Sequence, residues 1–174
     1  SKFWIKAQSN YNLVGNKRIF KTHSANITFQ GNYYTIPETT RGLIYILRDP
    51  RDIVISYAKH LNKKIDDVIF LLAQENATTY SAKGDYPIIL SRWDYHIKSW
   101  LDLKVPKFII KYEHLLENTS GVIKQLISFL NTSLGYKIDI DDDTLNEIIN
   151  QTSFDSLRYK EINGGFPEAT KNTL

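Results

Sequence analysis

The sequence predicts an α/β fold in which a mostly parallel central sheet is flanked by helices. Two observations carry this prediction. Short, continuous apolar runs at residues 42–47 (GLIYIL) and 108–112 (FIIKY) have the composition of strands buried in a sheet. The segments between and after these runs repeat apolar residues at helical spacing. Strands that alternate with helices build a parallel sheet that the helices cover.

The elements can be placed in chain order from apolar spacing and boundary residues. A brief strand is expected at residues 18–22. The apolar strand at residues 42–47 leads into a helix that begins at Pro50, with Asp49 as its N-cap. Further helices are expected at residues 64–76, 90–101, 121–130 and 141–150, and a last helical turn opens at residues 152–154.

Composition limits the chemistry that this chain can carry. Cysteine is absent, which excludes a disulfide framework, a cysteine zinc site and a thiol nucleophile. The net charge of +3 is small and the charges are interleaved, so a small anionic ligand is favoured over nucleic acid. No apolar run approaches the ~20 residues that a membrane span requires. We therefore expect a cytoplasmic protein without a membrane span.

The polar turn Arg48-Asp49-Pro50 is a candidate anion site on physical grounds. It joins a buried strand to the first turn of a helix. Many α/β proteins bind phosphate groups at this position, because unpaired backbone N–H groups and the helix dipole favour negative charge.

Residues 45–57 (YILRDPRDIVISY) resemble the second nucleotide motif of the cytosolic-type sulfotransferases, approximately Y-V-V-R-N-P-K-D-V-A-V-S-Y. This family has a P-loop NTPase-like fold and uses 3′-phosphoadenosine-5′-phosphosulfate (PAPS). The resemblance implies that Arg48 and Ser56 hold the 3′-phosphate of the nucleotide. A guanidinium can grip a phosphate through two hydrogen bonds, and a helix hydroxyl can add another. The alternatives are a surface ion pair for Arg48 and an ordinary small helix residue at Ser56.

The segment Lys21-Thr22-His23 resembles the K-T-H loop of the same family. The resemblance implies that His23 is the general base for the acceptor and that Lys21 neutralises the sulfuryl oxygens. Histidine has an unperturbed pKa of about 6.5, so it can accept a proton at neutral pH, whereas a lysine would need a large shift. The alternative is that His23 is an ordinary exposed loop histidine.

Residues 108–115 (FIIKYEHL) resemble the family's strand that ends in Y-E-D-L, with His114 in place of Asp. The resemblance implies that Tyr112 contacts the adenine side of the nucleotide. Residues 91–101 (SRWDYHIKSWL) resemble the helix behind the acceptor pocket. We assign this helix no catalytic part, because tryptophans at helical spacing are more often core residues.

Residues 151–154 (QTSF) resemble the T-S-F segment of the family, whose threonine and phenylalanine also border the adenine. Thr152 and Phe154 are the matching residues. An aromatic face can stack on a purine. The alternatives are a helix cap at Thr152 and a core ring at Phe154.

The resemblance runs from residue 18 to residue 166, but two family motifs are missing. Residues 1–14 contain no P-K-S-G-T-T-W turn, and the chain ends at residue 174 without an R-K-G loop. We therefore expect a single domain over residues 1–174 that is incomplete at both ends. The acceptor pocket is expected from loops at residues 28–40 and 76–86.

The expected function is transfer of a sulfuryl group from PAPS to a hydroxyl or amine of a small-molecule acceptor. The product nucleotide is 3′,5′-adenosine diphosphate (PAP), and no metal is required. One alternative is a P-loop nucleotide kinase, which needs a Walker Gly-Lys-Ser/Thr and a magnesium carboxylate. The other is a nucleotide-binding relative without transfer activity.

Overall fold

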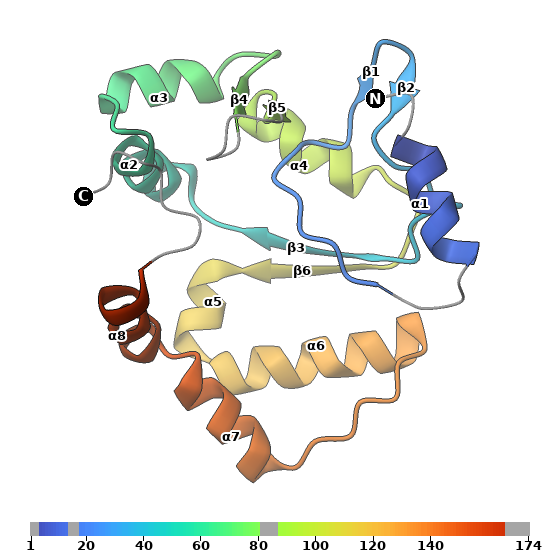
Figure 1. Ribbon diagram of the computed structural model, residues 1–174, viewed down its shortest axis with the longest axis vertical. Helices are drawn as coiled ribbons and strands as arrows, with labels where there is room; N and C mark the ends of the chain where they lie inside the picture. Colours follow the sequence, from blue (N-terminus) through green and yellow to red (C-terminus); the bar gives the residue numbers. More distant parts are fainter. Residues whose placement is uncertain (1–3, 14–17, 81–86, 166–174) are drawn as a thin grey trace.

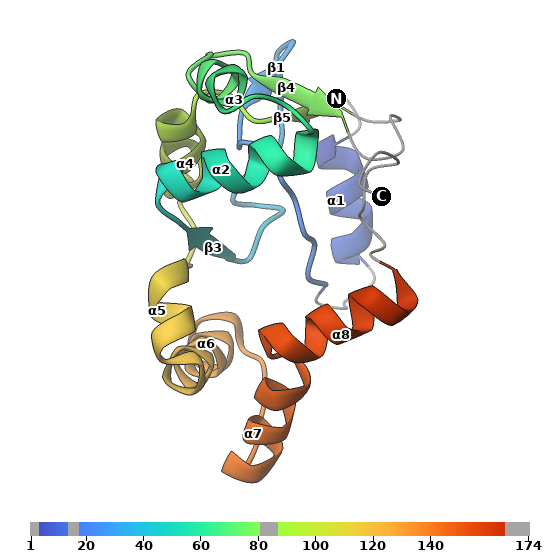
Figure 2. The same ribbon diagram turned by 90° about the vertical axis from the view of Figure 1, so that its left-hand side faces the viewer.

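The computed structural model describes residues 4–13, 18–80 and 87–165 (Figure 1). At its centre, strands β3 (Leu43–Leu47) and β6 (Lys107–Lys111) run parallel, in a register that pairs Leu43 with Lys107 and Leu47 with Lys111. Helices lie on both sides of this pair (Figures 1 and 2). The parallel strand pair between helices confirms the predicted architecture.

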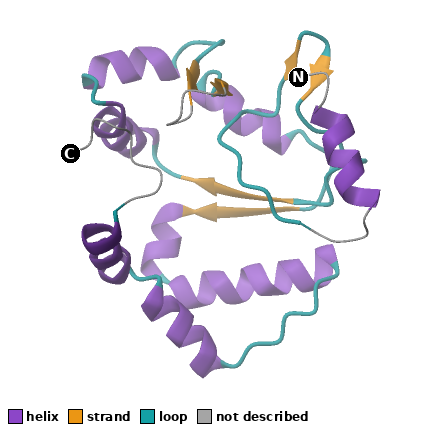
Figure 3. Cartoon of the chain, viewed as in Figure 1, coloured by secondary structure: helices purple, strands orange, loops and turns teal. Residues whose placement is uncertain are grey.

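The remaining elements surround this pair (Figure 3). The helices are α1 (Trp4–Leu13), α2 (Pro50–Leu61), α3 (Ile65–Leu72), α4 (Trp93–Leu101), α5 (Tyr112–Glu117), α6 (Thr119–Leu134), α7 (Asp142–Gln151) and α8 (Phe154–Gly164). The short strands are β1 (Thr28–Phe29), β2 (Asn32–Tyr33), β4 (Thr78–Tyr80) and β5 (Pro87–Ile89), and they form two antiparallel pairs, β1 with β2 and β4 with β5.

Helix α2 begins where its sequence predicts. The carboxylate of Asp49 accepts a hydrogen bond from the backbone N–H of Arg51 at 2.9 Å, which makes Asp49 the N-cap. Asn62 ends the helix in the left-handed conformation, with φ of 52°. Because α2 starts directly after β3, its first turn lies at the carboxyl end of the central strands.

Several predicted boundaries are wrong. Residues 18–22 form no strand, because they pair with none of the described strands and all five are exposed. The helix expected at residues 64–76 ends at Leu72. Tyr112 opens α5 instead of closing the preceding strand. The helical turn expected at residues 152–154 is a full helix, α8, whose N-cap is Ser153.

Strand β3 is less buried than its apolar sequence indicates. Leu43 is buried and packs against Trp100 and Leu103, which form the centre of the core. Ile44 and Ile46, on the opposite face, are 37% and 57% exposed within the described chain. The expectation of burial on both faces is therefore wrong here, because the described residues cover only one face of this strand.

None of the helices in the described ranges is long and apolar enough to cross a membrane. The same ranges hold no cluster of three or more His, Asp or Glu side chains that could ligate a metal ion.

Candidate functional site

The carboxyl ends of the two central strands bring Arg48 and Tyr112 together. Leu47 and Lys111 are the last paired residues of β3 and β6, and each is followed directly by one of these two residues. The guanidinium carbon of Arg48 lies 4.5 Å from the centre of the Tyr112 ring. A flat cation over an aromatic face is a favourable contact that fixes the plane of the guanidinium. Two residues far apart in the sequence thus form one side of a site.

Arg48 has unused hydrogen-bonding capacity. Its side chain is 34% exposed overall, but its Nε is buried and has no hydrogen-bond partner among the described residues. The carboxylate of Asp52 is 3.8 Å from this nitrogen, which is too long for a hydrogen bond. A buried donor without a partner is costly, and an anionic ligand beside it would satisfy the group.

The backbone amides at the start of α2 are already engaged, which corrects the expectation of unpaired N–H groups. The N–H of Asp49 donates to a Glu113 carboxylate oxygen at 3.3 Å. The N–H groups of Asp52 and Ile53 both donate to the carbonyl of Asp49 at 3.1 Å. Arg51 N–H is bound by the Asp49 side chain, and Pro50 has no N–H. An anion at this turn must therefore be held mainly by side chains.

Asp49 is held as a carboxylate by its neighbour. Arg51 donates to both carboxylate oxygens, at 3.0 and 3.1 Å from Nε. The side-chain hydrogen bond from Arg51 is the main reason that the pKa of Asp49 is lowered to about 2. This pairing neutralises a negative charge directly beside the Arg48 site. An anion approaching Arg48 therefore meets less repulsion.

Ser56 lies about two turns along α2, on an exposed position. Its hydroxyl donates to the carbonyl of Ile53 at 3.1 Å. A hydrogen bond of this kind, within the helix, is typical of an ordinary helix serine. The hydroxyl oxygen can still accept a hydrogen bond, and the hydroxyl proton can rotate to another acceptor. A role in binding phosphate stays a prediction.

The predicted adenine residues Thr152 and Phe154 lie at the junction of α7 and α8. Thr152 is the C-cap of α7, and its hydroxyl donates to the carbonyl of Ile148 at 2.7 Å. These are the contacts of a helix cap, which was the alternative to a role at the adenine. Phe154 is 74% exposed. The core-ring alternative is therefore wrong within the described chain. Figure 1 places α8 on the side toward which β3 and β6 point.

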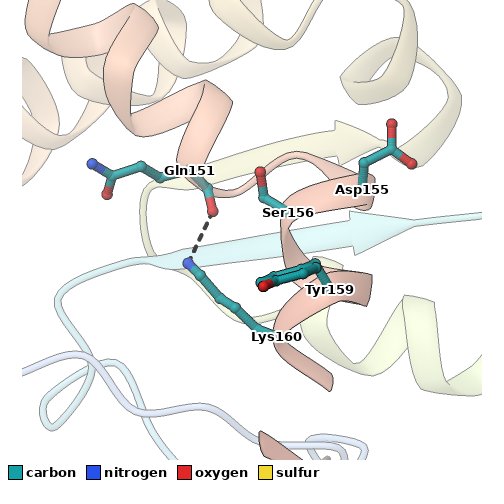
Figure 4. A pocket seen from close by; sticks show the side chains of 5 residues that line it. All are labelled: Gln151, Asp155, Ser156, Tyr159 and Lys160. Carbon is teal, nitrogen blue, oxygen red and sulfur yellow. Dashed lines mark hydrogen bonds between the residues drawn. The ribbon is translucent and has the colours of Figure 1, made fainter. Parts of the chain in front are cut away.

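A shallow hollow of about 410 Å³ lies at the same junction (Figure 4). Its lining residues come from the end of α7 and the outer face of α8: Gln151, Asp155, Ser156, Tyr159 and Lys160. The ammonium of Lys160 donates to the carbonyl of Gln151 at 3.1 Å. The sequence analysis did not identify this hollow, because its lining depends on the angle between two helices.

His23 and Lys21 lie on one exposed loop, before β1. Thr22, between them, shares a hydrogen bond of 2.5 Å with the hydroxyl of Tyr34. The carbonyl of His23 is 3.2 Å from Nε2 of His96 on α4. Nδ1 of His96 is in turn 2.8 Å from the hydroxyl of Tyr45 on β3. The loop is therefore tied to β3, the strand that leads into Arg48.

Burial sets the charge states of His96 and Tyr45, the two residues that link the loop to β3. It lowers the pKa of His96 and raises the pKa of Tyr45 to about 12. At neutral pH the imidazole and the phenol are thus both uncharged. From the sequence, the helix at residues 91–101, which carries His96, was expected to have no catalytic part. The contact of His96 with Tyr45, fifty-one residues earlier on β3, could not be read from either segment alone.

These features define an α/β protein with a candidate anion site centred on Arg48 at the end of its central strands and a histidine-bearing loop tied to the same strand. The domain model of one family matches this chain over residues 5–170 and is described as "Sulfotransferase domain". The chain therefore belongs to the sulfotransferase family.

Curated relatives agree with this assignment at low identity. The chain is 23% identical to Sulfotransferase 2A1 of Macaca fascicularis over 167 residues, and 24% identical to Sulfotransferase 2A1 of Mus musculus over 168 residues. Each match covers 91% of this chain and 53% of the relative. Sulfotransferase 1A1 of Rattus norvegicus is 27% identical over 121 residues. The chain spans about half the length of the 2A1 relatives.

A solved structure has the same fold. Mouse sulfotransferase SULT7A1, which was crystallised as a complex with PAP, superposes with a TM-score of 0.56 at 20% sequence identity. The match covers 86% of this chain and 51% of the mouse chain. The predicted fold class, the P-loop NTPase-like fold of sulfotransferases, is thereby confirmed.

Proposed function

We propose that this chain carries the core of a sulfotransferase that transfers a sulfuryl group from PAPS to a hydroxyl or amine of a small-molecule acceptor. The main observation behind this proposal is that strand β3 connects the Arg48 half of the site to the His23 half. It leads directly into Arg48, which lies over Tyr112, and three residues before Arg48, Tyr45 bonds to His96, which bonds to the His23 loop. At ~3.3 Å per strand residue, the two attachment points are about 10 Å apart along the strand.

The proposed nucleotide site uses five residues. Arg48 and Ser56 bind the 3′-phosphate, and the buried Nε of Arg48 supplies a donor that has no hydrogen-bond partner among the described residues. Tyr112, Thr152 and Phe154 border the adenine, and the exposed ring of Phe154 is free to stack on a base. That PAP was bound in the mouse structural relative supports a nucleotide of this kind.

The proposed transfer step is an in-line displacement at sulfur. The acceptor oxygen forms a bond to sulfur while the bond from sulfur to the bridging phosphate oxygen breaks, and PAP leaves with that electron pair. His23 takes the proton of the acceptor hydroxyl, and Lys21 stabilises the negative charge that spreads over the sulfuryl oxygens. No step of this scheme uses a metal ion.

The proposal leaves the acceptor open beyond its class as a small molecule. The loops expected to form its pocket, residues 28–40 and 76–86, fall partly outside the described residues. Within the described part they contain the β1–β2 hairpin and β4. A cytoplasmic location belongs to the same proposal.

The test is a binding and transfer assay on the full-length protein. Calorimetric titration with PAP and with ATP plus magnesium should show PAP binding at least about tenfold tighter, which is ~1.4 kcal/mol. Radiolabelled PAPS is then offered with a panel of phenols and sugars. The variant His23→Ala should lower transfer by about 10²- to 10⁴-fold, the usual worth of general base catalysis. His60→Ala, on the exposed face of α2, is the matched control.

Other outcomes identify the alternatives. Tighter binding of ATP with magnesium would support a nucleotide kinase, although the sequence lacks a Walker Gly-Lys-Ser/Thr. Tight PAP binding without transfer to any acceptor in the panel would support a nucleotide-binding relative. Transfer that is equal in wild type and His23→Ala would remove His23 from the mechanism.

A further inference from the structure

We propose that His96 is a positioning residue, held by Tyr45, that sets the backbone of His23 for its role as the base. This inference rests on the proposed function, because it explains how that base is held. Helix α4 is joined to the His23 loop by several hydrogen bonds.

One face of α4 supplies three separate attachments to this loop. Nε2 of His96 faces the carbonyl of His23 at 3.2 Å. Trp100 Nε1 donates to the carbonyl of Ser24 at 3.1 Å. The Ser99 hydroxyl accepts from the N–H of Asn26 at 3.0 Å. Positions 96, 99 and 100 have the i, i+3, i+4 spacing that places side chains on one helix face.

The partners of His96 determine which of its nitrogens carries the proton. A carbonyl oxygen can only accept, so Nε2 must donate to His23. In a neutral imidazole the other nitrogen, Nδ1, is then an acceptor, and the Tyr45 hydroxyl must donate to it. The rings of Tyr45 and His96 lie 5.9 Å apart at 60°. The result is a directed chain of donors from β3 through α4 to the loop.

Among the three attachments, the one made by His96 is closest to the proposed chemistry. It binds the carbonyl of His23 itself, whereas Trp100 and Ser99 bind residues further along the chain. Buried Trp100 is also a core residue, so its replacement would disturb folding. His96 and Tyr45 can be altered with less damage, because both are only half-buried.

The experiment compares four variants of the full-length protein in the PAPS transfer assay. His96→Leu removes both hydrogen bonds, while His96→Gln keeps an N–H near the position of Nε2. Tyr45→Phe removes only the donor to Nδ1. Tyr95→Phe, on the exposed side of the same helix, is the matched control. For each variant we measure kcat, KM for the acceptor, the Kd for PAP and the melting temperature.

We expect His96→Leu to lower kcat by about 10- to 100-fold, the size of effect that follows a shift of ~1 Å in a reacting group. The Kd for PAP should change by less than about twofold, since the nucleotide site is separate. His96→Gln should recover most of the loss, and Tyr45→Phe should cost about three- to tenfold. In a His23→Ala background, His96→Leu should cost less than about twofold, because no base remains to be positioned.

Two results would overturn the inference. One is that His96→Gln is no better than His96→Leu; the other is that His96→Leu lowers kcat equally with and without His23. If the wild type transfers no sulfate, the proposed function fails, and nitrogen-15 NMR of the histidines decides the inference separately. It should show a proton on Nε2 of His96 at neutral pH and a changed Nδ1 signal in Tyr45→Phe. A proton on Nδ1 instead would exclude the arrangement.

Discussion

Arg48 combines two properties that are seldom found together in a surface arginine. Its guanidinium is fixed over the ring of Tyr112, and its Nε is buried without a hydrogen-bond partner among the described residues. Ordinary surface ion pairs contribute little to stability, and the 3.8 Å separation from Asp52 makes this pair a weak one. These properties favour a ligand-binding role for Arg48 over the alternative of a surface ion pair.

Replacing Arg48 should therefore weaken PAP binding with little effect on the fold. We expect Arg48→Gln to raise the Kd for PAP by about 10- to 100-fold, since hydrogen bonds to charged groups are worth roughly 1.5–3 kcal/mol. Arg48→Lys should recover only part of the affinity, because an ammonium cannot bind two phosphate oxygens in one plane. Calorimetric titration with PAP measures the Kd of both variants, and Arg92→Gln at the start of α4 is the control.

The nucleotide itself supplies a second control for Arg48. Adenosine 5′-diphosphate lacks the 3′-phosphate, so its affinity should be nearly the same for wild type and Arg48→Gln. An equal loss of affinity for both nucleotides would mean that Arg48 contacts another part of the ligand. The assignment of Arg48 to the 3′-phosphate would then be wrong.

His96 should make stability depend on pH. Burial lowers its pKa in the folded state, so the unfolded chain binds a proton more readily than the folded chain below about pH 6.5. The free energy of unfolding is then highest above that pH and decreases as the pH falls toward the lowered pKa. The paired carboxylates, such as Asp49, titrate at lower pH and do not contribute in this window.

Urea unfolding at pH 7.5 and pH 5.5 tests this expectation. The wild type should be less stable at the lower pH, and His96→Gln should show a smaller difference between the two. His114→Gln, on an exposed position of α5, should keep the difference of the wild type. A pH dependence that survives in His96→Gln would show that another group is responsible.

At the scale of elements, local signals predicted more than long-range ones. Asp49 and Pro50 were sufficient to place the start of α2 correctly, because caps act through neighbouring residues. Residues 18–22 looked like a strand but are irregular, since a strand requires a partner that composition cannot supply. The β1–β2 and β4–β5 pairs were missed for the related reason that each strand is only two or three residues long.

In the candidate site, too, local motifs predicted some residues, while contacts between distant elements were not predicted. Arg48 and Tyr112 could be selected from motifs, and the parallel register then explains why they meet. The engaged amides of α2 could not be foreseen, because the Glu113 carboxylate reaches Asp49 from a different element. The link from Tyr45 through His96 to His23 likewise joins three elements by side-chain contacts. Such contacts depend on packing rather than on local sequence.

Helix α7 offers a test of capping at the scale of one element. The carboxylate of Asp141 accepts a hydrogen bond from the N–H of Thr144 at 2.7 Å, and it stands at the positive end of the helix dipole. We expect Asp141→Ala to lower the free energy of unfolding clearly and Asp141→Asn by much less, since asparagine also caps well. Urea unfolding measures both, and equal losses for the two variants would contradict a capping role.

At the scale of the whole molecule, the proposed nucleotide must join elements that are separate in the sequence. In the proposed arrangement the 3′-phosphate would lie at the end of β3, and the adenine would contact both α5 and the α7–α8 junction, so one ligand should restrain all three regions together. Ligand binding stabilises the folded state and slows local opening, which amide hydrogen exchange detects.

With saturating PAP, we expect protection to rise around residues 48–56, residues 112–117 and residues 150–157. The exchange of α6 should change little, because the proposed contacts do not involve it. Adenosine 5′-diphosphate should give the same protection at α5 and at the α7–α8 junction but less at residues 48–56. If PAP protects the start of α2 and leaves residues 150–157 unchanged, Thr152 and Phe154 do not border the adenine, and the hollow beside them has another role.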